Sequence, residues 1–166
     1  MIRVPISRQN PEVRFSEDAV DRLVELTAGS AYLLMILCAE LVDYLNEVRH
    51  NNVIAAHIDQ LVDRVFTGGV ITASNFDPLY NDVSCPGDER RRDDNFTLLV
   101  ELARRTRLAP AVSMGQLTPE GLTPARVAEL LKTLEARGVV KVEQNQYSIV
   151  VGLFREWLIN RYGDAL

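Results

Sequence analysis

Side chains that commonly carry out chemistry are sparse in this sequence, and their spacing does not group them. The only two histidines, His50 and His57, have no cysteine or carboxylate partner at the spacing of metal ligands. The two cysteines, Cys38 and Cys85, are too few for a disulfide framework. The Asp93–Asp94 pair begins a predicted helix, where the helix dipole explains acidic residues without acid–base catalysis. We therefore predict no catalytic residue and no metal ligand in this chain.

Nucleotide hydrolysis requires a phosphate cradle and a bound cation, and the sequence supplies neither. It contains no glycine-rich loop followed by Lys and Ser or Thr, whose backbone N–H groups would hold the phosphates. It also contains no apolar strand ending in acidic residues that could bind Mg²⁺. We therefore expect this chain not to be an enzyme and not to bind a cofactor by itself.

Basic residues gather in two places where they could contact phosphates or a protein. The Arg90–Arg92 run is flanked by acidic residues, which favours a solvated linker over a phosphate site. The second place is a helix predicted after Thr123 together with the hairpin that follows it. Its candidate contact residues for DNA or a partner protein are Arg126, Glu129, Lys132, Thr133, Arg137 and Lys141. Because Glu129 and Glu135 would also face the phosphates, DNA binding is open but less favoured than protein binding.

Residues 1–68 have the pattern of a three-helix bundle. A first helix starts after Ser16, a good N-cap, and ends near Gly29. A second helix, capped by Ser30, is apolar nearly all round in its first half, so we expect it to be central and buried. A third helix spans Ala55–Phe66. The residues that this arrangement places in the core, rather than in a ligand pocket, are Tyr32, Met35, Ile36 and Leu37.

Residues 69–90 are rich in turn formers, and we assign them to a linker in which a short helix could form around Phe76–Asn81. Residues 91–166 then have the element order of a winged helix-turn-helix domain. The predicted elements are a helix over Asp94–Thr106, a strand over Pro110–Gly115, a Thr123-capped helix ending at Gly138, a hairpin of Val139–Glu143 and Tyr147–Val151, and a helix over Leu153–Tyr162. The predicted fold class is mainly α with a small β-hairpin wing, a three-helix bundle followed by a winged helix.

Composition narrows the class of protein further. Hydrophobic residues make up 47% of the 166 residues, enough for a packed core. No apolar run is long enough to span a bilayer, and the N-terminus lacks the apolar stretch of a signal peptide. The net charge of −5 argues against general nucleic-acid binding. The charge is −4 over residues 1–70 and only −1 over residues 71–166, so the second half could still carry local basic patches. These features predict a cytoplasmic protein without a membrane partner.

Four stretches together resemble the helical lid of STAND-type ATPases, a signalling branch of the AAA+ superfamily, namely Ile2–Pro5, Phe15–Val20, Leu26–Leu34 and Leu41–Asn46. Val151–Leu158 is similar to the end of the winged helix that often follows this lid. In that family a Gly-x-Pro motif packs near the adenine. The matching residues here, which the resemblance places near the nucleotide, lack the proline and are Gly29, Ser30 and Ala31.

The resemblance implies an upstream ATPase core, which would hold ATP and Mg²⁺, and a regulatory role for this chain. Met1 is then expected to be an internal position or an artificial start. The lid and the winged helix would pack on their own core and transmit its nucleotide state by rigid-body movement. Surfaces that normally face the core could also let the chain form a homo-oligomer. The alternative is a DNA-binding winged-helix domain, as in a transcription regulator or a replication initiator.

Overall fold

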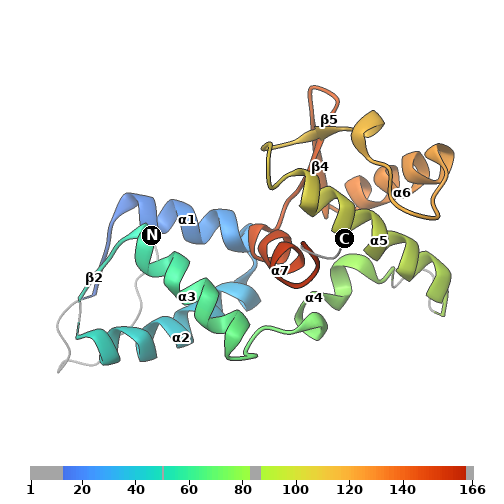
Figure 1. Ribbon diagram of the computed structural model, residues 1–166. Coiled ribbons are helices and arrows are strands. Elements are labelled where there is room, and N and C mark those ends of the chain that lie inside the picture. The colour runs from blue at the N-terminus through green and yellow to red at the C-terminus, as the bar shows by residue number, and fades with distance from the viewer. Residues whose placement is uncertain (1–12, 50, 83–86, 164–166) are drawn as a thin grey trace. The chain divides into compact units, whose positions relative to one another are not determined.

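The structure is a computed structural model that describes residues 13–49, 51–82 and 87–163 (Figure 1). It divides into two compact units, Met1–Val70 and Ile71–Leu166, and each is described by itself. Helices dominate both units and the sheets are small, which confirms a mainly α fold with few strands.

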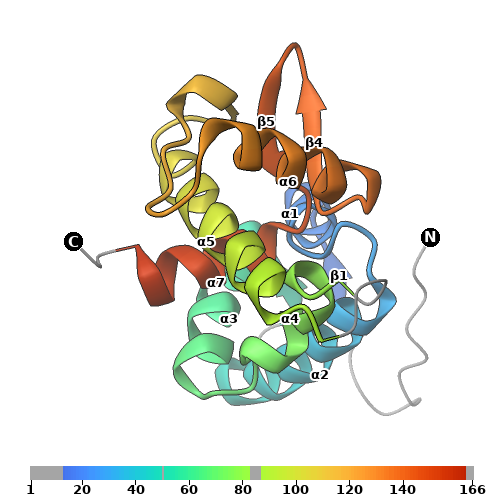
Figure 2. The same ribbon diagram turned by 90° about the vertical axis from the view of Figure 1, so that its right-hand side faces the viewer.

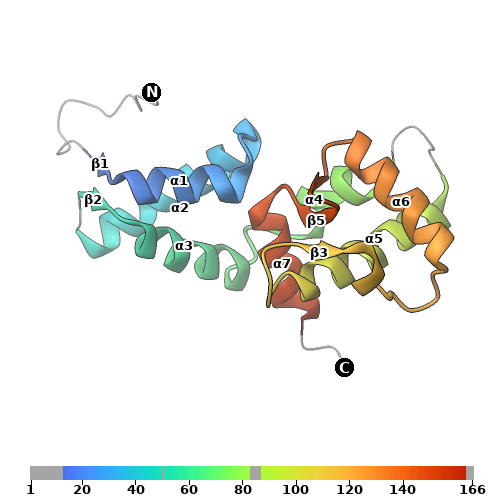
Figure 3. The same ribbon diagram turned by 90° about the horizontal axis from the view of Figure 1, so that it is seen from above.

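Three helices form the first unit: α1 (Glu17–Thr27), α2 (Ala31–Val48) and α3 (Ala55–Thr67). Each helix contacts the other two, and Figure 3 shows them running side by side. A short parallel pairing joins β1 (Arg14–Phe15) to β2 (Asn52–Val53). This pairing holds the residues that precede α1 beside the residues that connect α2 and α3.

Local hydrogen bonds and backbone conformation set the helix ends in this unit. Ser16 precedes α1 but does not cap it with its side chain, because its Oγ donates instead to a carbonyl of β2 at 2.9 Å. Ala28, in a left-handed conformation with φ 48°, ends α1 one residue before the predicted Gly29. Ser30 caps α2 as predicted, accepting the Leu33 N–H at 3.4 Å.

Only one face of α2 is buried, which corrects the expectation of a central helix buried all round. Its buried residues recur at every fourth position and are Leu33, Leu37, Leu41 and Leu45. Tyr32 and Met35 are 52% and 64% exposed, and Ile36 is half-buried, so the predicted core position is right for Leu37 alone. A helix in a three-helix bundle has neighbours on one side only, so the bundle leaves the opposite side of α2 open to solvent.

The second unit combines helices with a three-stranded antiparallel sheet. In chain order its elements are α4 (Ala73–Tyr80), α5 (Glu89–Arg105), β3 (Val112–Ser113), the 3-10 helix η1 (Met114–Gln116), α6 (Pro124–Ala136), β4 (Val140–Glu143), β5 (Gln146–Ile149) and α7 (Gly152–Tyr162). The strand order is β3-β5-β4. Gln144 and Asn145 both have positive φ, 50° and 61°, as a two-residue type I′ turn requires. The predicted hairpin is therefore confirmed.

The helix α4 lies within the predicted linker, yet it belongs to the core of the second unit. Phe76 is fully buried, and its ring centroid lies 5.0 Å from that of Phe154 and 5.5 Å from that of Trp157. The short helix expected around Phe76–Asn81 is therefore present, and it packs in the core instead of lying in an exposed linker. The large apolar surface of these aromatic rings outweighs the turn-forming tendency of the surrounding residues.

The helix α5 begins at Glu89, earlier than the start predicted at Asp94. Asp88 caps it by accepting the Arg91 N–H at 3.0 Å. The Arg90–Arg92 run is consequently helical. Figure 2 shows α5 between α6 and α7, and it contacts both. The large, fully buried side chains of these three helices include Leu98, Leu99, Leu102, Leu130, Leu131, Leu134, Leu153, Phe154 and Leu158.

Candidate functional site

The helix α6 carries most of the predicted contact residues, and local signals set its ends. Thr123 caps it by accepting the Arg126 N–H at 3.3 Å, and Pro124 occupies its first position. Gly138, with φ 70°, follows its last turn. The buried face consists of Val127, Leu130, Leu131 and Leu134. The predicted contact residues therefore occupy the sides and the outer face of the helix.

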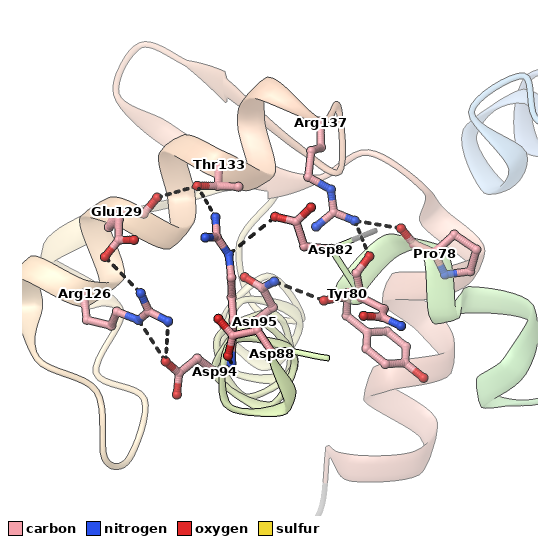
Figure 4. A network of polar contacts seen from close by, with 12 residues as sticks. Pro78, Tyr80, Asp82, Asp88, Asp94, Asn95, Arg126, Glu129, Thr133 and Arg137 are labelled. Carbon is pink, nitrogen blue, oxygen red and sulfur yellow. Dashed lines mark hydrogen bonds and ion pairs between the residues drawn. The ribbon is translucent and has the colours of Figure 1, made fainter. Parts of the chain in front are cut away.

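Arg126 is held between two carboxylates of its own unit (Figure 4). Its Nε and Nη2 each lie 2.8 Å from Asp94 Oδ2, and its Nη1 lies 3.0 Å from Glu129 Oε2. The hydrogen bond to Asp94, followed by that to Glu129, raises the pKa of the Arg126 guanidinium above its ordinary value. With two carboxylates around one cation, this residue is a poor ligand for a phosphate group.

Arg137 joins the end of α6 to the end of α4. Its Nη2 donates to the carbonyl oxygens of Pro78 and Asn81, both at 2.8 Å. Figure 4 shows the bond to Pro78. The last carbonyl groups of a helix have no partner within the helix, so a guanidinium beside them satisfies otherwise unpaired acceptors. Arg137 thus acts in the packing of this unit rather than as an outward-facing contact.

Thr133 also turns toward the interior of the unit. Its Oγ1 donates to the Glu129 carbonyl at 3.1 Å and accepts from Arg91 Nη2 at 3.3 Å. Below it, the fully buried Asn95 donates its Nδ2 to the Tyr80 carbonyl at 3.0 Å. These contacts connect α4, α5 and α6 through one polar network, shown in Figure 4.

Arg91 and Arg92, from the predicted basic run, face α4 and the residues that follow it. Arg91 Nε lies 3.4 Å from a carboxylate oxygen of Asp82, which is buried. Arg92 Nη2 lies 3.1 Å from Asp77 Oδ1, and its guanidinium lies over the Tyr80 ring, 5.5 Å from the centroid. A hydrogen bond to Tyr80 raises the pKa of Arg92. Arg91 and Arg92 therefore hold α4 and the residues after it on α5, whereas Arg90 is exposed.

The outer face of α6 carries small side chains and a slight excess of acidic residues. Its exposed residues include three alanines, Ala125, Ala128 and Ala136, and three charged residues, Glu129, Lys132 and Glu135. On the hairpin, Lys141 Nζ lies 3.3 Å from Glu143 Oε1, and both side chains are exposed. Of the six predicted contact residues, Glu129, Lys132 and Lys141 are thus exposed, whereas Arg126, Thr133 and Arg137 are half-buried.

The three predicted nucleotide-proximal residues form the turn between α1 and α2. Gly29 has φ 77°, a left-handed conformation that favours glycine, and Ala31 is exposed at the start of α2. The Ser30 hydroxyl accepts the Leu33 N–H, so its polar group serves the helix start. The structure gives these residues a local role in turning the chain.

The first unit exposes a group of large apolar side chains that the sequence analysis assigned to the core or passed over. Val20 and Val24 of α1 and Met35 and Val42 of α2 are between 42% and 64% exposed, and we call these four residues the α1–α2 apolar face. The clue in the sequence was that α2 has more apolar residues than one buried face can hold. Exposed apolar groups that lie together mark binding surfaces.

Contacts with α3 place these four residues on one side of the bundle. Arg22 of α1 binds Asp59 of α3 at 2.8 Å, and Glu47 of α2 binds Arg64 of α3. At 100° per residue, the two exposed valines of α1 lie opposite Arg22, and the exposed residues of α2 lie away from Glu47. Because α1 and α2 are in contact and are joined by a tight turn, the two flanks that face away from α3 adjoin.

Acidic residues border this apolar face. Glu17 and Asp21 lie on the outer side of α1, and both are exposed. The face therefore combines an apolar centre with carboxylates at its edge, which suits a partner with apolar and basic groups.

Within the described ranges, no group of three or more His, Cys, Asp and Glu side chains could hold a metal ion. In the same ranges, no helix is both long and apolar enough to cross a membrane. Comparison with known proteins found no family model, no curated protein and no solved structure that matches this chain.

Proposed function

We propose that this chain is a non-catalytic interaction module, the helical lid and winged helix of a STAND-type signalling ATPase of the cytoplasm. The observation that carries the proposal is the α1–α2 apolar face, because a bundle with a complete core still exposes Val24 and Met35 to 58% and 64%. Covering apolar surface stabilises a complex by about 25 cal/mol per Å². Such a face is better suited to a protein partner than to a phosphate backbone.

The element order of the second unit supports the winged-helix part of the proposal. A helix, a short strand, a further helix and a hairpin follow one another, and the strand order β3-β5-β4 places the first strand beside the last. In the proposed parent protein, ATP and Mg²⁺ are bound by the upstream core. Its nucleotide state would shift the population of lid positions, provided that the two states make different contacts with the lid.

The DNA-binding alternative has less support from the same residues. Arg126 and Arg137 are committed to Asp94 and to backbone carbonyl groups, and Lys132 shares the outer face of α6 with Glu129 and Glu135. A helix that reads DNA places cations, not carboxylates, toward the phosphates.

The test is a titration of this chain with the separately expressed polypeptide encoded directly upstream in the same reading frame. Calorimetry without nucleotide, with Mg·ADP and with a Mg·ATP analogue should give dissociation constants that differ at least about fivefold between nucleotide states. An upstream segment without a phosphate loop, or equal affinity in all three states, would reject the ATPase proposal. In parallel, tight salt-dependent binding of duplex DNA that Lys132→Ala and Lys141→Ala weaken would favour the alternative.

A further inference from the structure

The hairpin of the second unit has an edge to which a further strand can add. Among the described strands, β4 pairs with β5 alone, because it stands at the end of the order β3-β5-β4. Figure 2 shows the tip of this hairpin extending beyond α6. An edge strand carries backbone N–H and C=O groups that can pair with another chain.

The pairing with β5 determines which backbone groups of β4 point to this edge. The Val150 N–H donates to the Val139 carbonyl at 3.0 Å. Because hydrogen-bonded and non-hydrogen-bonded pairs alternate along an antiparallel ladder, Lys141 and Glu143 direct their N–H and C=O groups toward β5. The N–H and C=O of Val142, which lies between them, therefore point to the open edge.

The side chains of β4 carry opposite charges at alternate positions. Lys141 and Glu143 are exposed on one face of the strand, and Val142 is half-buried on the other. Lys141 Nζ lies 3.3 Å from Glu143 Oε1. Their side chains are nevertheless 54% and 73% exposed, so each can also approach a charge on a neighbouring strand.

These charges select one register for pairing with an identical strand. With Val142 opposite Val142 in an antiparallel pair, Lys141 of each copy lies opposite Glu143 of the other. A shift of two residues in one direction places Lys141 opposite Lys141, and a shift in the other direction places Glu143 opposite Glu143. Opposite charges across two strands stabilise a sheet and like charges destabilise it, so the register centred on Val142 is favoured.

We propose that two copies of this chain associate by antiparallel pairing of their β4 strands about a two-fold axis at Val142. Each Val142 N–H donates to the Val142 carbonyl of the other copy, which joins the two three-stranded sheets into one. Each Lys141 keeps the Glu143 of its own strand and gains that of the second strand. A lysine at a sheet edge usually discourages pairing, but here a carboxylate faces it.

The contact is isologous, because both copies use the same surface, and it therefore closes at a dimer. The strand β4 has only four residues, so its pairing gives a weak dimer that forms at high protein concentration. The inference goes beyond the proposed function, since neither an upstream core nor a nucleotide takes part in this contact.

The test measures the dissociation constant of the full chain by sedimentation velocity over a concentration series. Lys141→Glu and Glu143→Lys each place two pairs of like charges across the contact and should raise the dissociation constant at least about fivefold. The double exchange, Lys141→Glu with Glu143→Lys, restores opposite pairs and should dimerise like the wild type. Lys132→Glu makes the same charge change at an exposed position of α6 and is the matched control that should leave the constant unchanged.

A mixture of the two single variants gives the sharpest result. One copy then carries two carboxylates and the other two lysines, so an equimolar mixture should form a heterodimer at least about fivefold tighter than either variant alone. Val142→Pro removes the outward N–H but no hydrogen bond to β5, so it should prevent dimerisation and leave the hairpin folded. Circular dichroism checks that every variant is folded.

Three results would overturn the inference: a wild type that is monomeric at every concentration, a dimer that the variants at Lys141, Val142 and Glu143 leave unchanged, or a mixture that pairs no more tightly than its components. The second is the result expected if the α1–α2 apolar face drives self-association. Each measurement uses this chain alone and is independent of the titration with the upstream polypeptide, so either proposal can fail while the other stands.

Discussion

Replacing Phe76 with alanine tests whether α4 is part of the folded second unit. The side chain is fully buried against the rings of Phe154 and Trp157, and Phe→Ala changes in cores cost about 3–5 kcal/mol. Two ring contacts place this site in the upper half of that range, so we expect Phe76→Ala to lower the free energy of unfolding by about 4 kcal/mol. If the segment were a linker, the change would stay within about 0.5 kcal/mol.

Trp157 makes this effect measurable within the second unit alone. It is the only tryptophan of the chain and it contacts Phe76, so its fluorescence during urea unfolding reports on this unit. With a urea dependence of about 1.5 kcal/mol per molar, the expected loss lowers the midpoint by roughly 2–3 M. Ser74→Ala, at an exposed position of α4 itself, is the control and should leave the midpoint nearly unchanged. A loss below about 1 kcal/mol for Phe76→Ala would refute the packing argument.

Two further predictions concern the polar network and the cysteine of α2. Arg137→Met removes two hydrogen bonds to the Pro78 and Asn81 carbonyls and should lower the free energy of unfolding by about 1.5–3 kcal/mol in the same urea assay. Arg137→Lys, which lacks the planar guanidinium, should recover less than half of this loss. An unchanged midpoint for Arg137→Met would contradict the role of Arg137 at the end of α4. Burial raises the pKa of the Cys38 thiol, so less thiolate is present at pH 8 in the folded chain than in urea. Iodoacetamide should therefore modify Cys38 several-fold more slowly in the folded chain, as measured by peptide mass spectrometry. Equal rates would show that the thiol is not shielded.

Elements set by neighbouring residues could be predicted from the sequence. The helix α6 has Thr123 at its cap, Pro124 at its start and Gly138 after its end, and the structure places the helix between these residues. The hairpin turn at Gln144–Asn145 is likewise a local signal. These features lie within a few residues of the conformations they determine, so they act in nearly any tertiary context.

The candidate site was harder to predict, because charge type is visible in the sequence and charge pairing is not. Arg126 and Arg137 are recognisable as cations that a ligand could use. Their partners, Asp94 and the carbonyl of Pro78, lie 32 and 59 residues away in the chain. Only the fold brings them within hydrogen-bond distance, and that pairing removes both cations from the outer surface.

The sequence by itself determined the mainly helical class, the hairpin, and the lack of a phosphate loop, since each depends on composition or on spacing between near neighbours. Tertiary structure decided which apolar residues are buried. Phe76, in a turn-rich segment, is enclosed by distant aromatic rings, whereas Met35, in the most apolar helix of the chain, is left in solvent. Burial depends on how many neighbouring elements surround a residue, and that number is a property of the fold rather than of the local sequence.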